Sequence, residues 1–324
     1  MNDRPTTTPP AASIAAAARD TGLSKDTLRV WERRYGFPRP DRDAFGERTY
    51  PPEQVDKLRL VKRLMDRGHR PGKIIGLPVE QLRQIAQATA VEPPGAAEDG
   101  GQLERLRGYI DLVKQHRVES LRQQLSQSLF RVGLSRFVIE LVAPLTERVG
   151  DAWSRGELEV FEEHLYTESI QVILRNAINA IPLAGADQAA RPRILLTTFP
   201  QEGHGLGVLM AEALFTLEGG RCLSLGVQTP IRDIVLAATV QQADIVALSF
   251  SSALSAGAVL DGLVELRAEL PASIEIWAGG SCPALHRRAP QAVRTLRTLE
   301  AIAPALAEWR DAHPHEHRPL PPSQ

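Results

Sequence analysis

The sequence predicts three folded parts within one chain of 324 residues: a small helical domain, an all-helical middle part and an α/β domain with a parallel sheet. The length exceeds what one compact core serves. Apolar residues recur at three- and four-residue steps through the first two parts. In the third part, short apolar runs alternate with helical runs, which is typical of a parallel sheet covered by helices.

Breaks in composition suggest the boundaries between these parts. Residues 1–11 and 311–324 are polar and rich in proline, so we expect disordered tails. Proline, glycine and acidic residues between 89 and 101 predict a linker. The remaining segments are expected to be the folded domains: 12–88, 102–182 and 190–310.

The composition excludes several classes of protein. No apolar run reaches the roughly 18 residues of a membrane span, and the first residues lack the apolar core of a secretory signal. Cys222 and Cys282 are the only cysteines, which excludes a disulfide framework and a thiolate-rich metal site. With so few cysteines, a reducing cytoplasm is the expected setting. We find no nucleophile elbow, zinc helix or phosphate loop, so we do not expect an enzyme.

The net charge of −1 conceals two oppositely charged regions. Residues 1–83 hold 17 Lys and Arg against 11 Asp and Glu, a net charge of +6, so the rest of the chain carries −7. A basic domain on an acidic body suggests that this domain meets a polyanion.

A helix-turn-helix is predicted at the start of the basic domain. One helix over 14–22 closes on Gly22, and Ser24 caps a second over 25–35. The polar segment 37–50 is suited to form a wing. The second helix presents an outward face suited to the major groove and phosphates: Thr27, Arg29, Arg33 and Arg34.

The motifs Ser24-Lys-Asp-Thr-Leu-Arg29, Trp31-Glu-Arg-Arg-Tyr-Gly36 and Arg48-Thr-Tyr50 resemble the winged helix-turn-helix of MerR-type transcription regulators. The resemblance covers residues 12–86 and implies a double-stranded DNA operator as partner. It places Tyr35, Arg48 and Tyr50, together with the arginines above, at or near DNA. Metal-sensing members continue into a long dimer helix, whereas this chain breaks at Pro93-Pro94, so heavy-metal sensing is not expected.

Helical periodicity between residues 102 and 182 predicts a four-helix bundle. Beyond residue 192 the alternation of runs predicts a doubly wound α/β domain of the Rossmann or flavodoxin-like kind. Strands are expected at 193–199, 222–227, 245–250 and 274–278, and helices at 206–217, 231–242 and 256–270.

The loop after the first of these strands is Phe199-Pro-Gln-Glu-Gly-His-Gly-Leu-Gly207, at the edge where doubly wound folds bind ligands. Its glycines permit a phosphate cradle, but their spacing misses the dinucleotide fingerprint and no Gly-Lys-Ser/Thr element follows. His204 suits a borderline transition metal, and Glu202 could orient it. An ordinary surface histidine is the alternative.

This loop and two later motifs resemble the cobalamin-binding module of methionine synthase and base-off mutases: Glu202-x-His204-x-x-Gly207, Ser252-x-Leu254 and Gly279-Gly280. The resemblance implies that His204 is the lower axial ligand of cobalt. It implies that the nucleotide tail lies in space left by Gly207, lined by Ser252 and Leu254. Gly279 and Gly280 would admit the nucleotide end. Most relatives carry Asp where Glu202 stands.

The pattern Trp153, Val160 and Glu163-His164 resembles the helical cap of the CarH/LitR-type light-dependent repressors. There these residues cover the upper cobalt face and the adenosyl group. Core packing of Trp153 and an exposed helix start at Glu163-His164 are the alternatives. Ser154 stands where well-studied members carry a histidine, and a hydroxyl is a poorer cobalt ligand than imidazole.

The combined resemblance implies a homo-oligomeric repressor, dimer or tetramer, that uses adenosylcobalamin to sense light and acts on carotenoid or light-response genes. Two alternatives stay open. One is a regulator that responds to cobalamin or another tetrapyrrole without light. The other is a corrinoid methyl carrier, against which the basic helix-turn-helix argues.

Overall fold

The computed structural model describes residues 11–43, 45–66, 69–88, 100–182, 191–252, 254–287 and 290–314. Residue contacts divide the chain into two compact units. The first unit holds Met1–Ala96 with Gly150–Glu159, and the second holds Ala97–Val149 with Val160–Gln324. The expected linker and both expected tails lie largely outside the described residues.

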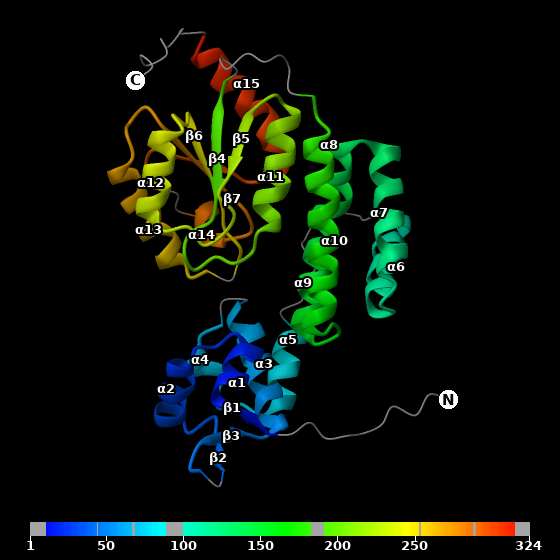
Figure 1. The fold of residues 1–324 in the computed structure, drawn as a ribbon, viewed down its shortest axis with the longest axis vertical. Helices are drawn as coiled ribbons and strands as arrows, with labels where there is room; N and C mark the ends of the chain where they lie inside the picture. The colour runs from blue at the N-terminus through cyan, green and yellow to red at the C-terminus, as the bar shows by residue number, and fades with distance from the viewer. Residues whose placement is uncertain are drawn as a thin grey trace. The chain divides into compact units, whose positions relative to one another are not determined.

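The head of the first unit, residues 12–88, is a winged helix-turn-helix, as predicted (Figure 1). Its helices are α1 (Ile14–Thr21), α2 (Lys25–Tyr35), α3 (Pro52–Asp66), α4 (Pro71–Ile74) and α5 (Val79–Ala88). The wing adds an antiparallel sheet of β1 (Ala12–Ser13), β3 (Arg48–Tyr50) and β2 (Asp41–Arg42), in that order. The head is thus helical apart from a small strand element.

Capping residues set the limits of the helix-turn-helix. The Ser24 hydroxyl accepts a hydrogen bond from the Thr27 amide at 3.0 Å, which satisfies a donor at the start of α2. Gly22 and Gly36 end α1 and α2 in the left-handed conformation, both with φ of 67°. Leu28 and Trp31 on α2 are buried in the core of the head, as their spacing predicted.

The bundle is formed by α6 (Gly100–Lys114), α7 (Val118–Val132), a third helix and α10 (Val160–Asn179). The third helix runs through α8 (Leu134–Arg136), a π-helical segment η1 (Phe137–Val142) and α9 (Ala143–Arg155). Because α6 begins at Gly100, the predicted linker was too long at its C-terminal end.

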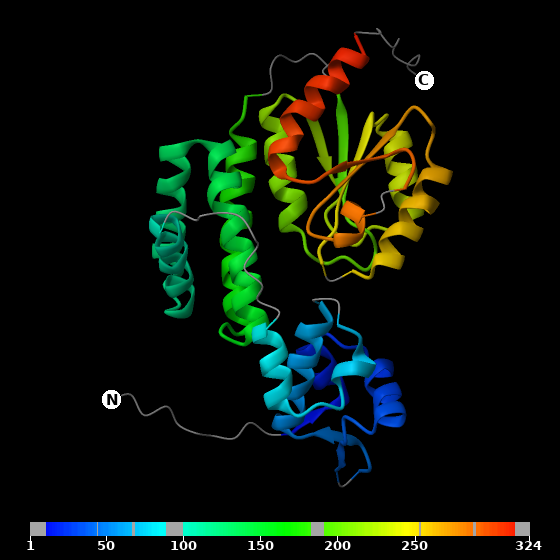
Figure 2. The same ribbon diagram turned by 180° about the vertical axis from the view of Figure 1, so that it is seen from behind.

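The α/β domain has one parallel sheet in the order β5-β4-β6-β7-β8 (Figures 1 and 2). The strands are β4 (Arg193–Thr197), β5 (Arg221–Ser224), β6 (Ile245–Ser249), β7 (Glu275–Gly279) and β8 (Val293–Leu296). The helices are α11 (Leu206–Leu217), α12 (Ile231–Val240), α13 (Ala256–Glu269), α14 (Pro283–Arg287) and α15 (Ile302–Ala312), the last after a short 3-10 turn η2 (Leu299–Ala301).

Strand β8 and the helices α14 and α15 were absent from the elements predicted for this domain. Strand β8 was not predicted, because it is a short edge strand with two polar residues at its centre and is only half-buried. Helix α15 continues to Ala312, two residues beyond the predicted domain end. Its buried Leu306 and Trp309 explain why this helix is part of the folded domain.

Helix α11 packs against β4 and also against α10 of the bundle, so almost all of its residues are buried. This double contact explains why its sequence is apolar nearly throughout. Among the helices of the described residues, none is long and apolar enough to cross a membrane.

Glu212 is the exception on this apolar helix. Its side chain is buried, and its Oε2 has no hydrogen-bond partner among the described residues. Arg175 Nη1 on α10 lies 3.9 Å away. Burial raises the pKa of Glu212, and the nearby Arg175 charge only partly opposes this.

We predict that Glu212→Gln raises the apparent melting temperature at neutral pH. A carboxyl group whose pKa is raised by folding destabilises the folded state as the pH rises above its ordinary unfolded-state pKa, and fully so above the raised pKa. Removing the buried charge should gain about 1 kcal/mol, or roughly 2–4 °C.

The gain in melting temperature should shrink as the pH falls toward the ordinary glutamate pKa. At that pH the buried Glu212 of the folded wild type is neutral, as the glutamine of the variant always is. Differential scanning fluorimetry across this pH range measures it. Glu218→Gln, at the exposed end of the same helix, is the matched control and should change little. A lower melting temperature for Glu212→Gln at neutral pH would contradict the prediction.

Candidate functional site

The loops after β4 and β6 meet at the point where the strand order of the sheet reverses. Strand β4 pairs with β5 on one side and with β6 on the other. In open parallel sheets, this reversal opens a crevice at the carboxyl ends of the two central strands. Residues 198–205 follow β4 and lead into α11, and residues 250–255 follow β6.

Glu202 joins these two loops. Its side chain is 1% exposed, and both of its oxygens accept hydrogen bonds. Oε1 accepts from the His204 amide at 2.9 Å and from His204 Nδ1 at 2.6 Å. Oε2 accepts from the Ser251 amide and the Ser251 hydroxyl, both at 2.7 Å.

These hydrogen bonds determine the charge of Glu202. Burial by itself would raise its pKa, but the hydrogen bonds from His204 and Ser251 outweigh burial and hold the pKa below its usual value. The side chain is therefore an ionised carboxylate, which can only accept hydrogen bonds.

The tautomer of His204 follows from this charge. Because the carboxylate is an acceptor, Nδ1 carries the proton and Nε2 carries the lone pair that can bind a metal. The His204 side chain is 63% exposed, so a large ligand can approach its ring. The predicted orientation of His204 by Glu202 is present in the structure.

Threonine side chains hold the backbone of the loop. The Thr198 hydroxyl donates to the Glu202 carbonyl at 2.7 Å and accepts from the Gln228 amide at 2.8 Å. The hydroxyls of Thr197 and Thr229 lie 2.7 Å apart. The loop that carries His204 is thus tied to the loop after β5 as well as to the loop after β6.

Ser251 is a site residue that sequence reasoning missed. Its hydroxyl lies 3.2 Å from His204 Nδ1 in addition to its two contacts with Glu202. The neighbouring Ser252, which was predicted, donates its amide to the Ser281 hydroxyl at 3.1 Å. The three serines at 249, 251 and 252, around the end of a buried strand, were the available signal.

The predicted glycines permit close backbone approaches. A Cβ atom at Gly207 would overlap the Ser249 hydroxyl, so this position lets α11 approach β6. The Ser249 hydroxyl lies directly beside Gly207, where the sequence predicted space for the nucleotide tail. Gly280 has φ of +108°, and a Cβ atom there would overlap the backbone of Phe250. Gly279 lies against Leu296, and Leu254 is buried.

The predicted cap residues lie on two helices. Val160 begins α10, and Glu163 in its first turn accepts a hydrogen bond from the Thr167 hydroxyl at 2.6 Å. His164 is exposed, with Nε2 3.7 Å from Glu163 Oε2. Trp153 lies in the last turn of α9, within the first unit. The side chain of Ser154 lies outside the described part of the chain.

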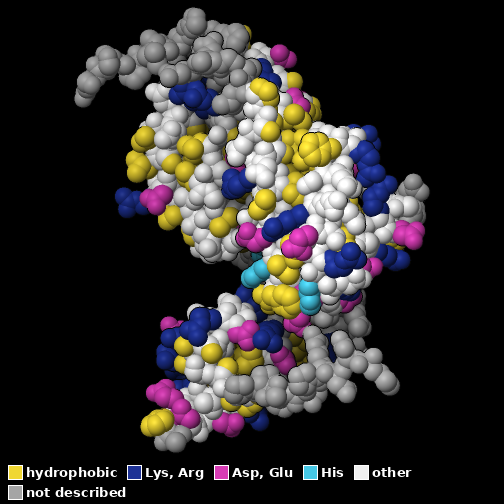
Figure 3. Space-filling view, turned by 45° about the vertical axis from the view of Figure 1, so that its right-hand side comes forward, with side chains coloured by type: hydrophobic (Ala, Val, Ile, Leu, Met, Phe, Trp, Pro, Cys, Tyr) yellow, Lys and Arg dark blue, Asp and Glu magenta, His cyan; other side chains and the backbone are white. Residues whose placement is uncertain are grey.

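The outward face of α2 carries the predicted DNA-binding arginines. Arg33 and Arg34 are exposed, and Arg29 Nη1 lies 3.1 Å from Asp26. Thr27 and Tyr35 are half-buried, with the Arg34 guanidinium over the Tyr35 ring. On the face shown in Figure 3, basic side chains of the head stand among acidic ones.

The surroundings of two wing residues, Arg48 and Tyr50, differ from those expected for side chains that contact DNA. Arg48 forms a half-buried ion pair with Glu32 at 2.9 Å, which ties the wing to α2. The prediction for Tyr50 was wrong: its side chain is fully buried in the core of the head. Because β3 is the central strand of the wing, the Tyr50 side chain turns inward while Thr49 lies on the opposite face.

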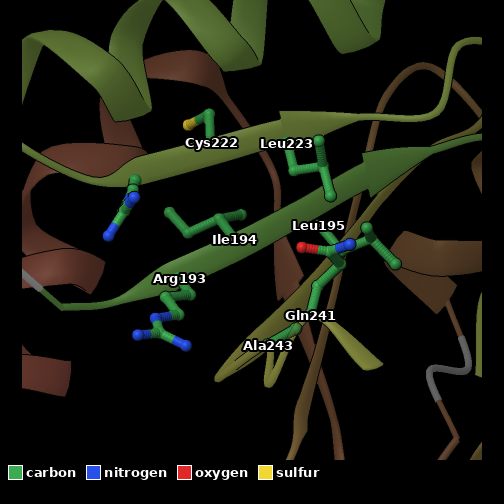
Figure 4. Close-up of a pocket in the computed structure, with 8 residues that line it drawn as sticks. Arg193, Ile194, Leu195, Cys222, Leu223, Gln241 and Ala243 are labelled. Carbon is green, nitrogen blue, oxygen red and sulfur yellow. The ribbon is translucent and has the colours of Figure 1, made fainter. Parts of the chain in front are cut away.

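A separate hollow lies along the β5 edge of the sheet (Figure 4). None of its lining residues was predicted as a site residue: Arg193, Ile194, Leu195, Arg221, Cys222, Leu223, Gln241 and Ala243. Burial raises the pKa of Cys222 to about 12, so its thiol stays protonated and unreactive at neutral pH.

The residues around His204 fit the cobalamin that the sequence implies. The donor of the loop is one imidazole, oriented by a buried carboxylate. Such a donor suits a metal that arrives with most of its ligands already in place, as cobalt does in a corrin ring. Close approaches at Gly207 and Gly280 bring α11 against Ser249 of β6, and the backbone after β7 against Phe250.

Comparisons with known proteins agree with these features. A model of the MerR HTH family regulatory proteins matches residues 12–78, and a model of the B12 binding domain matches residues 105–177. Among solved structures, the chain is similar to the monomethylamine corrinoid protein of Methanosarcina barkeri. That similarity has a TM-score of 0.47 and 15% identity, and covers 62% of this chain and 96% of the other.

Two curated relatives come from Myxococcus xanthus. The HTH-type transcriptional repressor CarA is 32% identical over 239 residues, which covers 73% of this chain and 75% of the relative. The HTH-type transcriptional repressor CarH is 30% identical over 279 residues, which covers 85% of this chain and 90% of the relative. With its MerR head and its B12 binding domain, the chain belongs to the family of CarH-type transcriptional repressors.

Proposed function

We propose that the protein is a DNA-binding transcriptional repressor whose DNA affinity and oligomeric state are controlled by adenosylcobalamin and light. The observation that carries the proposal is the arrangement of Glu202, His204 and Ser251 where the strand order reverses. Membership of the CarH-type family supports the regulatory role. By the same relationship, we propose carotenoid or light-response genes as targets.

The lower side of the cofactor would be held by the α/β domain. His204 Nε2 would occupy the lower axial position, with Nδ1 bonded to Glu202. The carboxylate keeps the ring in one tautomer and raises its basicity as a ligand. Ser252, Leu254, Gly279 and Gly280 remain proposed neighbours of the nucleotide tail.

The upper side would be covered by Trp153, Val160, Glu163 and His164, which exclude water from the upper ligand. Adenosylcobalamin, when bound, supplies a cobalt–carbon bond that visible light can break. A ligand changes DNA affinity only if it binds two states of the protein differently. We propose that the bound form is a homo-oligomer in which several heads share one DNA and gain affinity through effective concentration.

Ser154 supports a second candidate function, a regulator that responds to cobalamin without light. The position lacks the imidazole that family members place after the cap tryptophan, and serine cannot replace it as a strong cobalt ligand. A corrinoid methyl carrier is disfavoured by the DNA-binding head, and no enzymatic activity is proposed.

Replacing the proposed lower ligand should abolish its spectroscopic signature. Protein loaded with adenosylcobalamin in darkness should show the absorption spectrum of a base-off, histidine-ligated cobalamin, and His204→Ala should lose it. Glu202→Gln should weaken binding by about 10- to 100-fold, because the ring loses its charged partner. His69→Ala, on the head, is the control. An unchanged spectrum in His204→Ala would refute the ligand assignment.

Arg33→Ala and Arg34→Ala should weaken binding to a short DNA duplex of any sequence. If each side chain contacts a phosphate, each loss lowers the slope of log affinity against log salt by about 1. Fluorescence anisotropy across a salt series measures this slope. Tyr50→Phe should leave it unchanged, since the side chain is buried. Equal slopes for wild type and both arginine variants would exclude these contacts.

Illumination should lower the molecular mass of the oligomer that the loaded protein forms, and it should also lower the affinity of the protein for DNA. The measurement is light scattering and DNA retardation, with and without adenosylcobalamin, before and after green illumination. A response to cobalamin that is the same in darkness and light would favour the second candidate function. No response to either would reject both candidates.

A further inference from the structure

Trp153, the proposed cap residue, is held by an arginine of the DNA-binding head. Gly150–Glu159 belongs to the same compact unit as the head. Within that unit, the guanidinium carbon of Arg63 on α3 lies 5.2 Å from the centre of the Trp153 ring. Arg63 Nη2 lies 3.5 Å from the Leu158 carbonyl oxygen.

Arg63 is enclosed by the surrounding protein at this contact. The residue is 8% exposed, and burial lowers the pKa of its guanidinium, which Glu159 partly opposes. Gly156 has φ of +76°, and a Cβ atom at this position would lie 3.1 Å from Arg63 Nη1. The turn after α9 therefore leaves just enough room for the guanidinium.

This contact lacks the full set of polar partners that a structural arginine usually has. The buried Nε atom has no hydrogen-bond partner among the described residues. The guanidinium therefore relies on the face of Trp153 and the Leu158 carbonyl. A contact of this kind depends on the position of the tryptophan ring.

The chain connectivity gives the contact its significance. The chain passes from the second unit into the first after Val149 and returns at Val160. Trp153 accordingly belongs to the unit of the head, whereas Glu163 and His164 belong to the other unit.

We propose that Arg63 is a positioning residue that ties Trp153 to the DNA-binding head, so that an upper ligand contacting Trp153 restrains the head directly. This inference rests on the proposed function, because it needs a ligand on the upper side. By linkage, the Arg63–Trp153 contact strengthens the binding of a ligand that touches Trp153, and the bound ligand stabilises that contact in return.

The chemistry of arginine makes the contact specific. A planar guanidinium can stack on the indole face, whereas a lysine ammonium offers a point charge on a flexible stem. Arg63→Met removes the charge and the stacking plane while keeping a long apolar side chain. Arg63→Lys keeps the charge and should have an intermediate effect.

The first measurement uses the full-length protein without cofactor. Amide hydrogen exchange of Gly150–Glu159 should accelerate by about tenfold or more in Arg63→Met, because the turn loses its anchor. Arg83→Met, the same substitution at an exposed position of α5, should leave this exchange unchanged. Unchanged exchange in both Arg63 variants, with circular dichroism showing them folded, would overturn the proposal.

The second measurement compares two cobalamins in darkness by equilibrium dialysis. Arg63→Met should weaken the binding of adenosylcobalamin by about fivefold or more, and the binding of hydroxocobalamin by much less. The reason is that only adenosylcobalamin carries an organic upper ligand. Equal loss for both would show that Arg63 supports the fold in general and would overturn its positioning role. If the wild type bound neither cobalamin, the proposed function and the coupling would both fail, and the exchange measurement would still decide whether Arg63 holds Trp153.

Discussion

The buried carboxylate of Glu202 is the constraint on which the rest of the site depends. An ionised group in a protein interior is tolerated only when its hydrogen-bonding capacity is filled. Glu202 meets this condition with four hydrogen bonds, two from His204 and two from Ser251. The loops after β4 and β6 therefore cannot shift independently, and the His204 ring has one orientation and one tautomer.

The topology of the sheet makes this arrangement possible. Adjacent parallel strands bring their carboxyl ends to one edge, and the reversal of strand order leaves the edge between β4 and β6 open. Glycines at positions 207 and 280 let the surrounding backbone come close. Trp153, at the end of α9, contacts Arg63 of the DNA-binding head within the first unit.

Local patterns predicted the elements whose signals are local. Helix α11 has the predicted limits because its apolar run starts after a glycine loop and ends before a Gly-Gly pair. The helix-turn-helix followed from caps at Ser24 and Gly36. Strand β8 was missed, since a half-buried edge strand carries little apolar signal. Tyr50 was misplaced because the pairing of β3, not its sequence, turns the ring inward.

The sequence by itself determined which chemical groups are available and their spacing: a carboxylate two residues before a histidine, glycines around them, and a basic second helix in the head. Only the tertiary structure decided that Ser251 completes the environment of Glu202 and that Arg63 covers Trp153. Both contacts join residues far apart in the chain. Such partners are selected by long-range packing, which leaves no trace in local periodicity, so sequence reasoning could name His204 and Glu202 but neither Ser251 nor Arg63.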